Sequence, residues 1–359
     1  MEIKSSEQKR QHDSNGSTVH WTATLIRRWW LTLFIPIAVG IVSDTSLLMK
    51  YPQAVGLDGY YYVLQADSLR QTGHLLYSSS TPVLFYVLAV VSKITGDTVL
   101  AAKAVSIGFH VLLCAGLFVL LRVLSGRSWP GALAGLMAAI CGLHVYLIVE
   151  FVKSLAALAL FVWAVCFWLL AEKRAPSWRT RMVAGLCLVL AMLTHRAMWL
   201  VVAGIVLSVL ITYLLQRETK KALSLAVLVL VACFLMPWCL ASQTAFGLPC
   251  QMQTELLSHP ATPLDNIGWP EKILVAFFAP AALFVARIYR AQIDPRLLSC
   301  LAAVGVLSIL VTLNPFLDHG QGSLNVTGRL SNLAYLEAAV LVPGVFFVFA
   351  RMGQRRILF

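Results

Sequence analysis

LDGYYYVLQADSLRQTGHLLY, residues 57–77, follows the first strongly apolar run of the chain and concentrates polar side chains. The stretch holds two carboxylates, four tyrosines and a histidine, although only 12% of the residues of the whole chain are charged. Residues 82–96 then begin with an apolar run that ends at Ser92 and Lys93. This run is short for a membrane span and fits a re-entrant or interfacial helix. Together the two segments predict a long helical loop at a membrane surface.

The composition of the whole chain is that of a membrane protein. Hydrophobic residues make up 59% of its 359 residues, whereas soluble domains contain about 45–50%. Apolar runs of roughly 17–25 residues, the length that a helix needs to cross a bilayer, recur along it. The sequence therefore predicts an all-α polytopic membrane protein in contact with membrane lipids. The formal net charge of +12 does not indicate a nucleic-acid partner, because Lys and Arg accumulate in the short cytoplasmic loops of membrane proteins.

Hydropathy and charge together predict about ten transmembrane helices. They are placed near residues 29–47, 98–121, 130–148, 154–171, 182–194, 197–215, 222–240, 273–290, 297–314 and 331–350. The fifth and sixth meet at the outward turn Thr194-His195-Arg196, because the basic segments on both sides of them belong in the cytoplasm. With both termini inside, the 28 Lys and Arg residues divide into 20 on the cytoplasmic side and 8 on the outer side. This asymmetry supports the orientation.

The domain organisation that follows is simple. Residues 1–28 are polar and mixed in charge, which predicts a disordered cytoplasmic tail. Residues 29–350 form a single transmembrane domain, and residues 351–359 form a basic cytoplasmic tail. Three outer loops are expected, at residues 48–97, 241–272 and 315–330. If residues 82–96 crossed the membrane, the polarity of every later loop would reverse.

Two of the eight cysteines, Cys239 and Cys250, flank an outer loop. They are expected to form a disulfide if that compartment is oxidising; a disulfide and two free thiols are both open. The other six lie inside probable spans and are most simply buried apolar fillers.

The loop that contains residues 58–97 resembles the first outer loop of the GT-C superfamily of membrane glycosyltransferases. This superfamily includes protein mannosyltransferases, aminoarabinose transferases and oligosaccharyltransferases. The residues that match its pattern are Asp58, Tyr61, Tyr62, Ala66, Gly73, Pro82 and Gly96. Three further segments resemble the second outer loop with its span, the third outer turn and the last spans: VEFVKSLAALALFVWAVCFWLLAEKR (149–174), LTHRAMWLVV (193–202) and GRLSNLAYLEAAVLVPG (328–344). The chain departs from the family where the usual Asp-Glu pair is Asp58-Gly59.

The resemblance implies an inverting transfer of a sugar from a polyprenyl-phosphate-type lipid to a lipid, glycan or protein acceptor. The reaction needs a base for the proton of the acceptor hydroxyl and cations for the departing phosphate. Asp58 matches the catalytic Asp of the family; the alternative is an interfacial carboxylate. Glu150 becomes a candidate second acid and Lys153 a phosphate ligand, or the two form a pair that caps a helix. Asp58 and Glu150 are also the only candidates for a divalent-cation site.

The remaining candidates for substrate binding also have structural alternatives. Tyr61 and Tyr62 either shape the sugar pocket or belong to the interfacial aromatic belt. His195 and Arg196 bind acceptor or phosphate, or anchor the outer turn. Arg329 offers bidentate phosphate contact, or extends to lipid head groups.

Glu337 lies two turns after Arg329 in the same predicted helix. An ionisable group at that depth is usually functional or paired, so Glu337 is expected to neutralise Arg329 or a histidine such as His110.

Two other functions remain open from the sequence: a transporter or flippase of lipid-linked saccharides, and a non-catalytic subunit of an envelope-assembly complex. Transporters often show inverted repeats and broken helices at matching positions, and no internal repeat is evident here. The expected location is a bacterial cytoplasmic (inner) membrane, with the active site on the periplasmic face.

Overall fold

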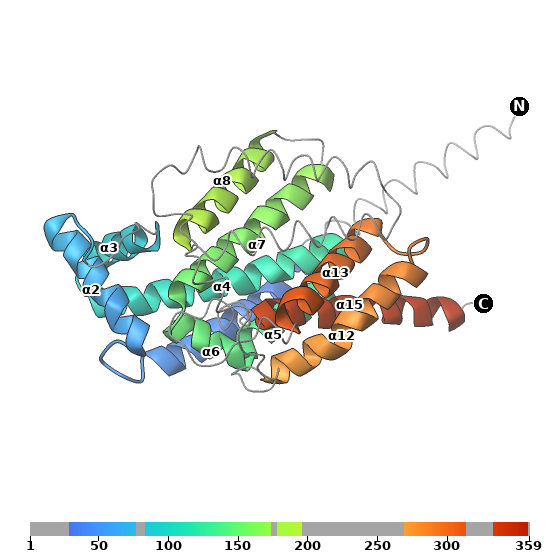
Figure 1. Ribbon diagram of the computed structural model, residues 1–359, viewed down its shortest axis with the longest axis horizontal. Helices are drawn as coiled ribbons and strands as arrows, with labels where there is room; N and C mark the ends of the chain where they lie inside the picture. The colour runs from blue at the N-terminus through green and yellow to red at the C-terminus, as the bar shows by residue number, and fades with distance from the viewer. Residues whose placement is uncertain (1–28, 77–82, 174–177, 196–268, 314–332, 358–359) are drawn as a thin grey trace, which may run out of the picture.

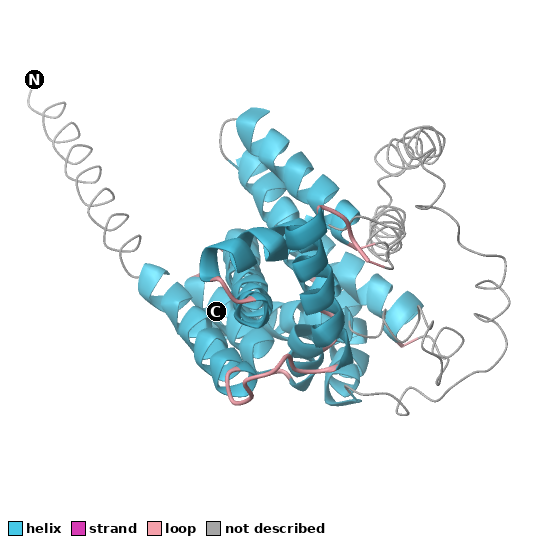
Figure 2. Ribbon diagram, turned by 90° about the vertical axis from the view of Figure 1, so that its left-hand side faces the viewer, coloured by secondary structure: helices cyan, strands magenta, loops and turns pink. Residues whose placement is uncertain are grey.

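The computed structural model describes residues 29–76, 83–173, 178–195, 269–313 and 333–357. This part of the chain is helical and contains no strand (Figures 1 and 2). The elements are an N-terminal helix Trp29–Leu48, α2 Leu57–Thr72, α3 Val83–Thr95, α4 Thr98–Ser125, α5 Ser128–Ile140, α6 Gly142–Val149, α7 Val152–Lys173, α8 Trp178–Thr194, α12 Trp269–Ile288, α13 Pro295–Leu307, the π-helical turn η1 Ser308–Thr312, and α15 Leu333–Ile357.

Four helices of the described residues are long and apolar enough to cross a membrane, or five if the bent pair α5–α6 counts as one span. The protein is therefore an integral membrane protein. Eight of the ten predicted spans coincide with described helices, although α8, α12 and α13 do not meet the criterion of length and hydropathy. The spans predicted at 197–215 and 222–240 lie outside the described residues, as do Cys239, Cys250 and loop 315–330, so the number ten stays a prediction.

Helix α4 is the centre of the bundle and packs against α3, α5 and α7 (Figure 1). Leu113, Leu117 and Leu121 follow one another at four-residue intervals, which places them on one face of the helix; all three are fully buried. Contact with α5 is close because Gly131 has no side chain: a Cβ there would collide with the carbonyl oxygen of Phe118.

The predicted outer loop consists of two helices, α2 and α3, which lie at one end of the bundle (Figure 1, left). Helix α2 ends at Gly73, in the left-handed conformation with φ 74°. Helix α3 has 13 residues, too few for a span, as the sequence predicted. Asp97 then starts α4 by accepting hydrogen bonds from the backbone N–H groups of Val99 and Leu100.

One predicted span, residues 130–148, is wrong as a continuous helix. Helices α5 and α6 meet at Cys141 with a bend of 61°, and Cys141 has the extended backbone ψ of 138°. The break persists because buried polar side chains of other helices satisfy backbone groups beside it: the carboxylate of Glu271, for example, accepts a hydrogen bond from the N–H of Leu143 at 3.1 Å.

The C-terminal helix is longer than predicted. Helix α15 runs to Ile357, so most of the segment expected as a basic tail continues the helix. Before it, α13 ends in the π-helical turn η1, in which the N–H of Leu313 donates to the carbonyl of Ser308 at 2.8 Å.

Candidate active site

A cavity of about 200 Å³ lies where α2, the start of α7 and the end of α8 meet. Its lining residues are Asp58, Tyr61, Tyr62, Phe151, Lys153, Ser154 and His195. Five of these were predicted as site residues from the sequence, and they come from three helices up to 137 positions apart in the chain (58 to 195). Arg196 and Arg329 lie outside the described residues.

Glu150 joins the cavity to the start of α2. Its Oε2 accepts a hydrogen bond from the backbone N–H of Asp58 at 3.1 Å. Glu150 itself ends α6, and α7 begins only at Val152. Its carboxylate instead lies at the N-terminus of α2, where the helix dipole favours a negative charge.

Gly56 makes this contact possible. Its φ is 78°, a left-handed conformation that L side chains rarely adopt. A Cβ at this position would also lie 2.6 Å from Oε1 of Glu150 and 2.5 Å from Cγ1 of Val149. The glycine therefore allows the chain to turn into α2 while the carboxylate of Glu150 approaches the amide of Asp58.

Tyr62 fixes the junction between α6 and α7. Its hydroxyl donates to the carbonyl of Glu150 and accepts from the backbone N–H of Lys153, both at 3.4 Å. The side chain is 2% exposed, whereas Tyr60 is 52% exposed and suits an interfacial position. Tyr62 is thus a packing and hydrogen-bonding residue of the cavity wall.

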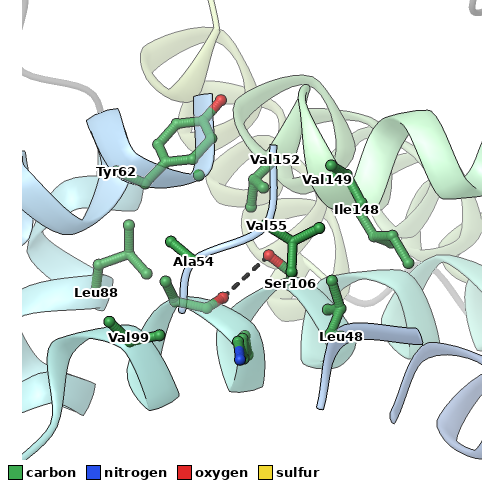
Figure 3. A pocket seen from close by; sticks show the side chains of 13 residues that line it. Leu48, Ala54, Val55, Tyr62, Leu88, Val99, Ser106, Ile148, Val149 and Val152 are labelled. Carbon is green, nitrogen blue, oxygen red and sulfur yellow. Dashed lines mark hydrogen bonds between the residues drawn. The ribbon is translucent and has the colours of Figure 1, made fainter. Parts of the chain in front are cut away.

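Tyr62 also lines a second, smaller cavity of about 20 Å³, which lies between α2, α4 and the start of α7 (Figure 3). Leu48, Val55, Leu88 and Val152 are among its lining residues, so its walls are mainly apolar. Beside it, the ammonium of Lys103 donates to the carbonyl of Tyr51 and holds the loop that precedes α2.

Three aromatic rings surround the ammonium of Lys153. The nitrogen lies 5.2 Å from the ring centre of Tyr61, 6.0 Å from that of Tyr62 and 5.8 Å from that of Phe85. Each distance is within the range of a cation–π interaction, about 6 Å. Phe85, which reaches the site from α3, was not predicted from the sequence. The feature that could have indicated it is its position as an aromatic residue in the first turn of that short apolar helix.

His195 completes the cavity at the C-terminal end of α8. Its backbone N–H donates to the carbonyl of Ala191, and its Nε2 lies 3.3 Å from the hydroxyl oxygen of Ser154. A helix C-terminus favours a side chain that can carry positive charge, and His195 is such a side chain. Ser154 was not predicted from the sequence.

The chemistry that the cavity offers is that of an acid, an ammonium and an imidazole among aromatic rings. Asp67, the other carboxylate of the first loop, is separate from it and pairs with Arg70 on the surface at 2.8 Å. No group of three or more His, Cys, Asp or Glu side chains suited to a metal ion occurs in the described part of the chain.

A second polar cluster lies inside the bundle and was missed by the sequence analysis. Asp44 Oδ2 lies 2.6 Å from Nδ1 of His110, and Asp44 Oδ1 lies 3.6 Å from Nε2 of His144. The rings of the two histidines stack with their centres 5.0 Å apart. The sequence feature that could have indicated this cluster is the presence of an aspartate and two histidines inside predicted spans.

This cluster corrects the expectation for Glu337. His110 pairs with Asp44 and approaches Tyr335, whose hydroxyl lies 3.2 Å from its Nε2. The carboxylate of Glu337 is buried beside the hydroxyl groups of Ser308 and Thr312. Its pairing with Arg329 falls outside the described residues.

Fold and composition together define an integral membrane protein built of helices. Residues 79–240 match the family model described as dolichyl-phosphate-mannose-protein mannosyltransferase. The structure is similar to the crystal structure of ArnT from Cupriavidus metallidurans in the apo state, with 16% sequence identity and a TM-score of 0.52. The similarity covers 91% of this chain and 60% of the ArnT chain. The family resemblance that the sequence indicated is therefore confirmed. No curated protein matches the chain.

Proposed function

We propose that the protein is an inverting glycosyltransferase that moves a sugar from a polyprenyl-phosphate-type lipid to an acceptor. The observation that carries the proposal is the single cavity in which Asp58, Lys153 and His195 meet. Such a site contains a group that can take a proton and two that can stabilise negative charge, which the transfer requires. The family match and the ArnT-like fold support the same class of reaction.

In the proposed reaction the acceptor hydroxyl attacks the anomeric carbon of the sugar, and Asp58 takes its proton. A new bond forms between the acceptor oxygen and the anomeric carbon. The bond between that carbon and the phosphate oxygen breaks on the opposite face of the sugar, which inverts the configuration. The phosphate leaves with the bonding electrons and stays on the polyprenyl lipid.

Lys153 is proposed to stabilise the departing phosphate. The surrounding rings attract its ammonium and restrict its position, so little reorganisation is needed when the charge develops. His195 adds a second donor on the opposite helix. Arg196 and Arg329 remain proposed phosphate or acceptor ligands on the sequence resemblance alone.

Glu150 is proposed to orient the base rather than to react. Its hydrogen bond to the amide of Asp58 fixes the first turn of α2, and a fixed geometry contributes to rate by reducing the entropy of activation. The proposed active face is the periplasmic side of an inner membrane, with both termini in the cytoplasm, on the distribution of Lys and Arg.

Reconstituted protein tests the proposal against its two alternatives. Full-length protein in liposomes receives a polyprenyl-phosphate sugar labelled on the sugar, together with detergent-solubilised envelope lipids and glycans as acceptors. Label recovered in a new product, with an equal amount of free polyprenyl phosphate, supports the transferase. Movement of intact labelled donor across the bilayer would indicate a flippase. If the donor is neither cleaved nor moved across the bilayer, the remaining interpretation is a non-catalytic assembly subunit.

A further inference from the structure

The break between α5 and α6 is surrounded by buried polar side chains that the proposed reaction does not use. Four of them come from other helices: Asp44 from the N-terminal helix, His110 from α4, Glu271 from α12 and Tyr335 from α15. Each is at most 2% exposed. Ionisable groups inside a membrane bundle are costly and usually have a function or a partner, so their convergence on one break requires an explanation.

These side chains satisfy the backbone of the break. The last carbonyls of α5 and the first N–H groups of α6 have no partner within their own helices. The carbonyl of Ala138 accepts a hydrogen bond from the hydroxyl of Tyr335 at 2.9 Å and lies 3.2 Å from Nε2 of His110. On the other side of the bend, Glu271 accepts from the N–H of Leu143 at 3.1 Å. A break inside a bilayer persists where such partners exist.

His144 connects this network to the first turn of α6. Its Nε2 lies 3.6 Å from Oδ1 of Asp44 and 3.4 Å from the hydroxyl of Ser43. Its ring is stacked on that of His110, with an angle of 8° between the planes. Asp44 therefore contacts both histidines and ties the N-terminal helix to α4 and α6. The direction in which α6 leaves the bend is set by at least three neighbouring helices.

The C-terminal end of α6, opposite the bend, lies at the candidate active site. Helix α6 has 8 residues, so it is about 12 Å long at about 1.5 Å per residue. Glu150 follows directly and remains bonded to the helix through its N–H and the carbonyl of Tyr146, at 2.9 Å. A tilt of about 10° at the bend would move the end of a helix of this length by about 2 Å. Displacements of about 1 Å at a reacting centre can cost about 100-fold in rate.

We propose that Asp44, His110 and Glu271 are positioning residues for the candidate active site. They fix the direction of α6 and so hold the carboxylate of Glu150 against the amide of Asp58, which places the proposed base. The kinetic consequence rests on the proposed function. The structural consequence, a protected amide at Asp58, is independent of it.

Two substitutions at Glu271 form a matched test. Glu271→Gln keeps an oxygen that can accept from Leu143, whereas Glu271→Ala removes it. We expect the Asp58 amide of Glu271→Ala to exchange its hydrogen at least about 10-fold faster than in wild-type protein, because an amide that loses its hydrogen-bond partner loses protection. Glu271→Gln should stay within about 3-fold of wild type. The measurement is residue-resolved hydrogen exchange on the full chain in nanodiscs.

Asp44→Asn provides a second variant, and Asp67→Asn on the surface of α2 is the control that should leave the amide unchanged. In the transfer assay, Asp44→Asn and Glu271→Ala should lower kcat by about 10- to 100-fold. The KM for the lipid donor should change less than kcat, because the proposed donor ligands Lys153 and His195 lie beyond α6, at the start of α7 and after α8.

Folded variants with wild-type exchange at Asp58 and wild-type kcat would overturn the proposal. So would variants whose only change is a lower unfolding temperature, since that result assigns the cluster to stability alone. If the wild-type protein transfers no sugar, the proposed function fails, and the hydrogen-exchange comparison alone still decides whether the cluster positions Glu150.

Discussion

Glu150 shows how much of the candidate site depends on a single contact between distant residues. Its carboxylate meets the amide of Asp58 across 92 positions of sequence, and its carbonyl accepts from the hydroxyl of Tyr62. The sequence indicated both acids but not the hydrogen bond that joins them. The residue that permits the contact, Gly56, has no polar group and gave no signal except its position before α2. Site residues are therefore easier to predict than the residues that hold them in place.

Gly56→Ala should disrupt the site more than the fold. Gly56 has φ 78° and ψ 166°, a region essentially restricted to glycine that costs other residues about 1–3 kcal/mol, and the added Cβ would also displace Glu150. Gly73→Ala is a matched control, because Gly73 has a φ of 74° and no atom within 4 Å of a Cβ. We expect a larger loss of unfolding temperature for Gly56→Ala than for Gly73→Ala, because only the first adds a collision, and a fall in kcat of roughly 10-fold or more for Gly56→Ala alone. Equal kcat values would show that Glu150 tolerates displacement.

Lys153→Met should weaken donor binding, because it removes a cation that three aromatic rings hold beside the cavity. A charge-assisted contact to phosphate contributes about 1.5–3 kcal/mol, so the KM for the lipid donor should rise about 10- to 100-fold. Lys153→Arg keeps the charge and should recover part of the loss. Lys50→Met removes another lysine that contacts a tyrosine ring, outside the cavity, and should have no effect. A normal donor KM in Lys153→Met would remove the residue from the binding site.

At the scale of the elements, local patterns and long-range contacts differ in how well they can be predicted. Helices α3 and α4 follow from hydropathy and from their glycine and aspartate boundaries, and α7 follows from hydropathy alone; these signals are local. The break at Cys141 does not, because it depends on Glu271, 128 positions away from its partner Leu143. A span predicted as continuous from its apolar composition is thus bent by a residue in another helix.

Helix α3 is predicted to lie at the membrane surface rather than across it. Ile94, which is 77% exposed, is a position for a spin label, and Leu186 on α8, 58% exposed, is the comparison inside a predicted span. In single-cysteine variants, Ile94 should be accessible to a water-soluble nickel chelate, whereas Leu186 should be accessible mainly to oxygen, which partitions into the bilayer core. Equal depths for the two labels would mean that α3 enters the hydrocarbon region.

At the scale of the whole molecule, charge distribution predicts an orientation that helix packing alone does not determine. Labelling of single cysteines with a membrane-impermeant reagent in intact cells should reach residues 48–97 and 241–272 but not residues 172–181 or 216–221. If the reagent reached residues 122–129 from outside, the later helices would have the orientation opposite to the predicted one. The site at Asp58 and His195 would then face two different compartments, which the shared cavity does not permit.

The architecture places the proposed base, the phosphate ligand and their supports at one end of the bundle. Helices α2, α7 and α8 supply the cavity, while α12 and α15 supply the polar groups that hydrogen-bond the backbone on the two sides of the break between α5 and α6. Family resemblance predicted the first set, because its residues match a motif. The second set contains no motif and was visible only once the helices were packed together.

Turnover by Asp58→Asn is the measurement that decides whether this cavity is an active site. The substitution preserves size and the backbone N–H that Glu150 accepts from, but it removes the carboxylate that is proposed to take the proton. Purified full-length protein at saturating lipid donor should lose about 10²- to 10⁴-fold in kcat, the usual contribution of a general base, with an unchanged unfolding temperature. Asp67→Asn should retain nearly full activity. Near-normal turnover by Asp58→Asn would contradict the assignment of Asp58 as the base and would mean that the acceptor proton leaves by another group.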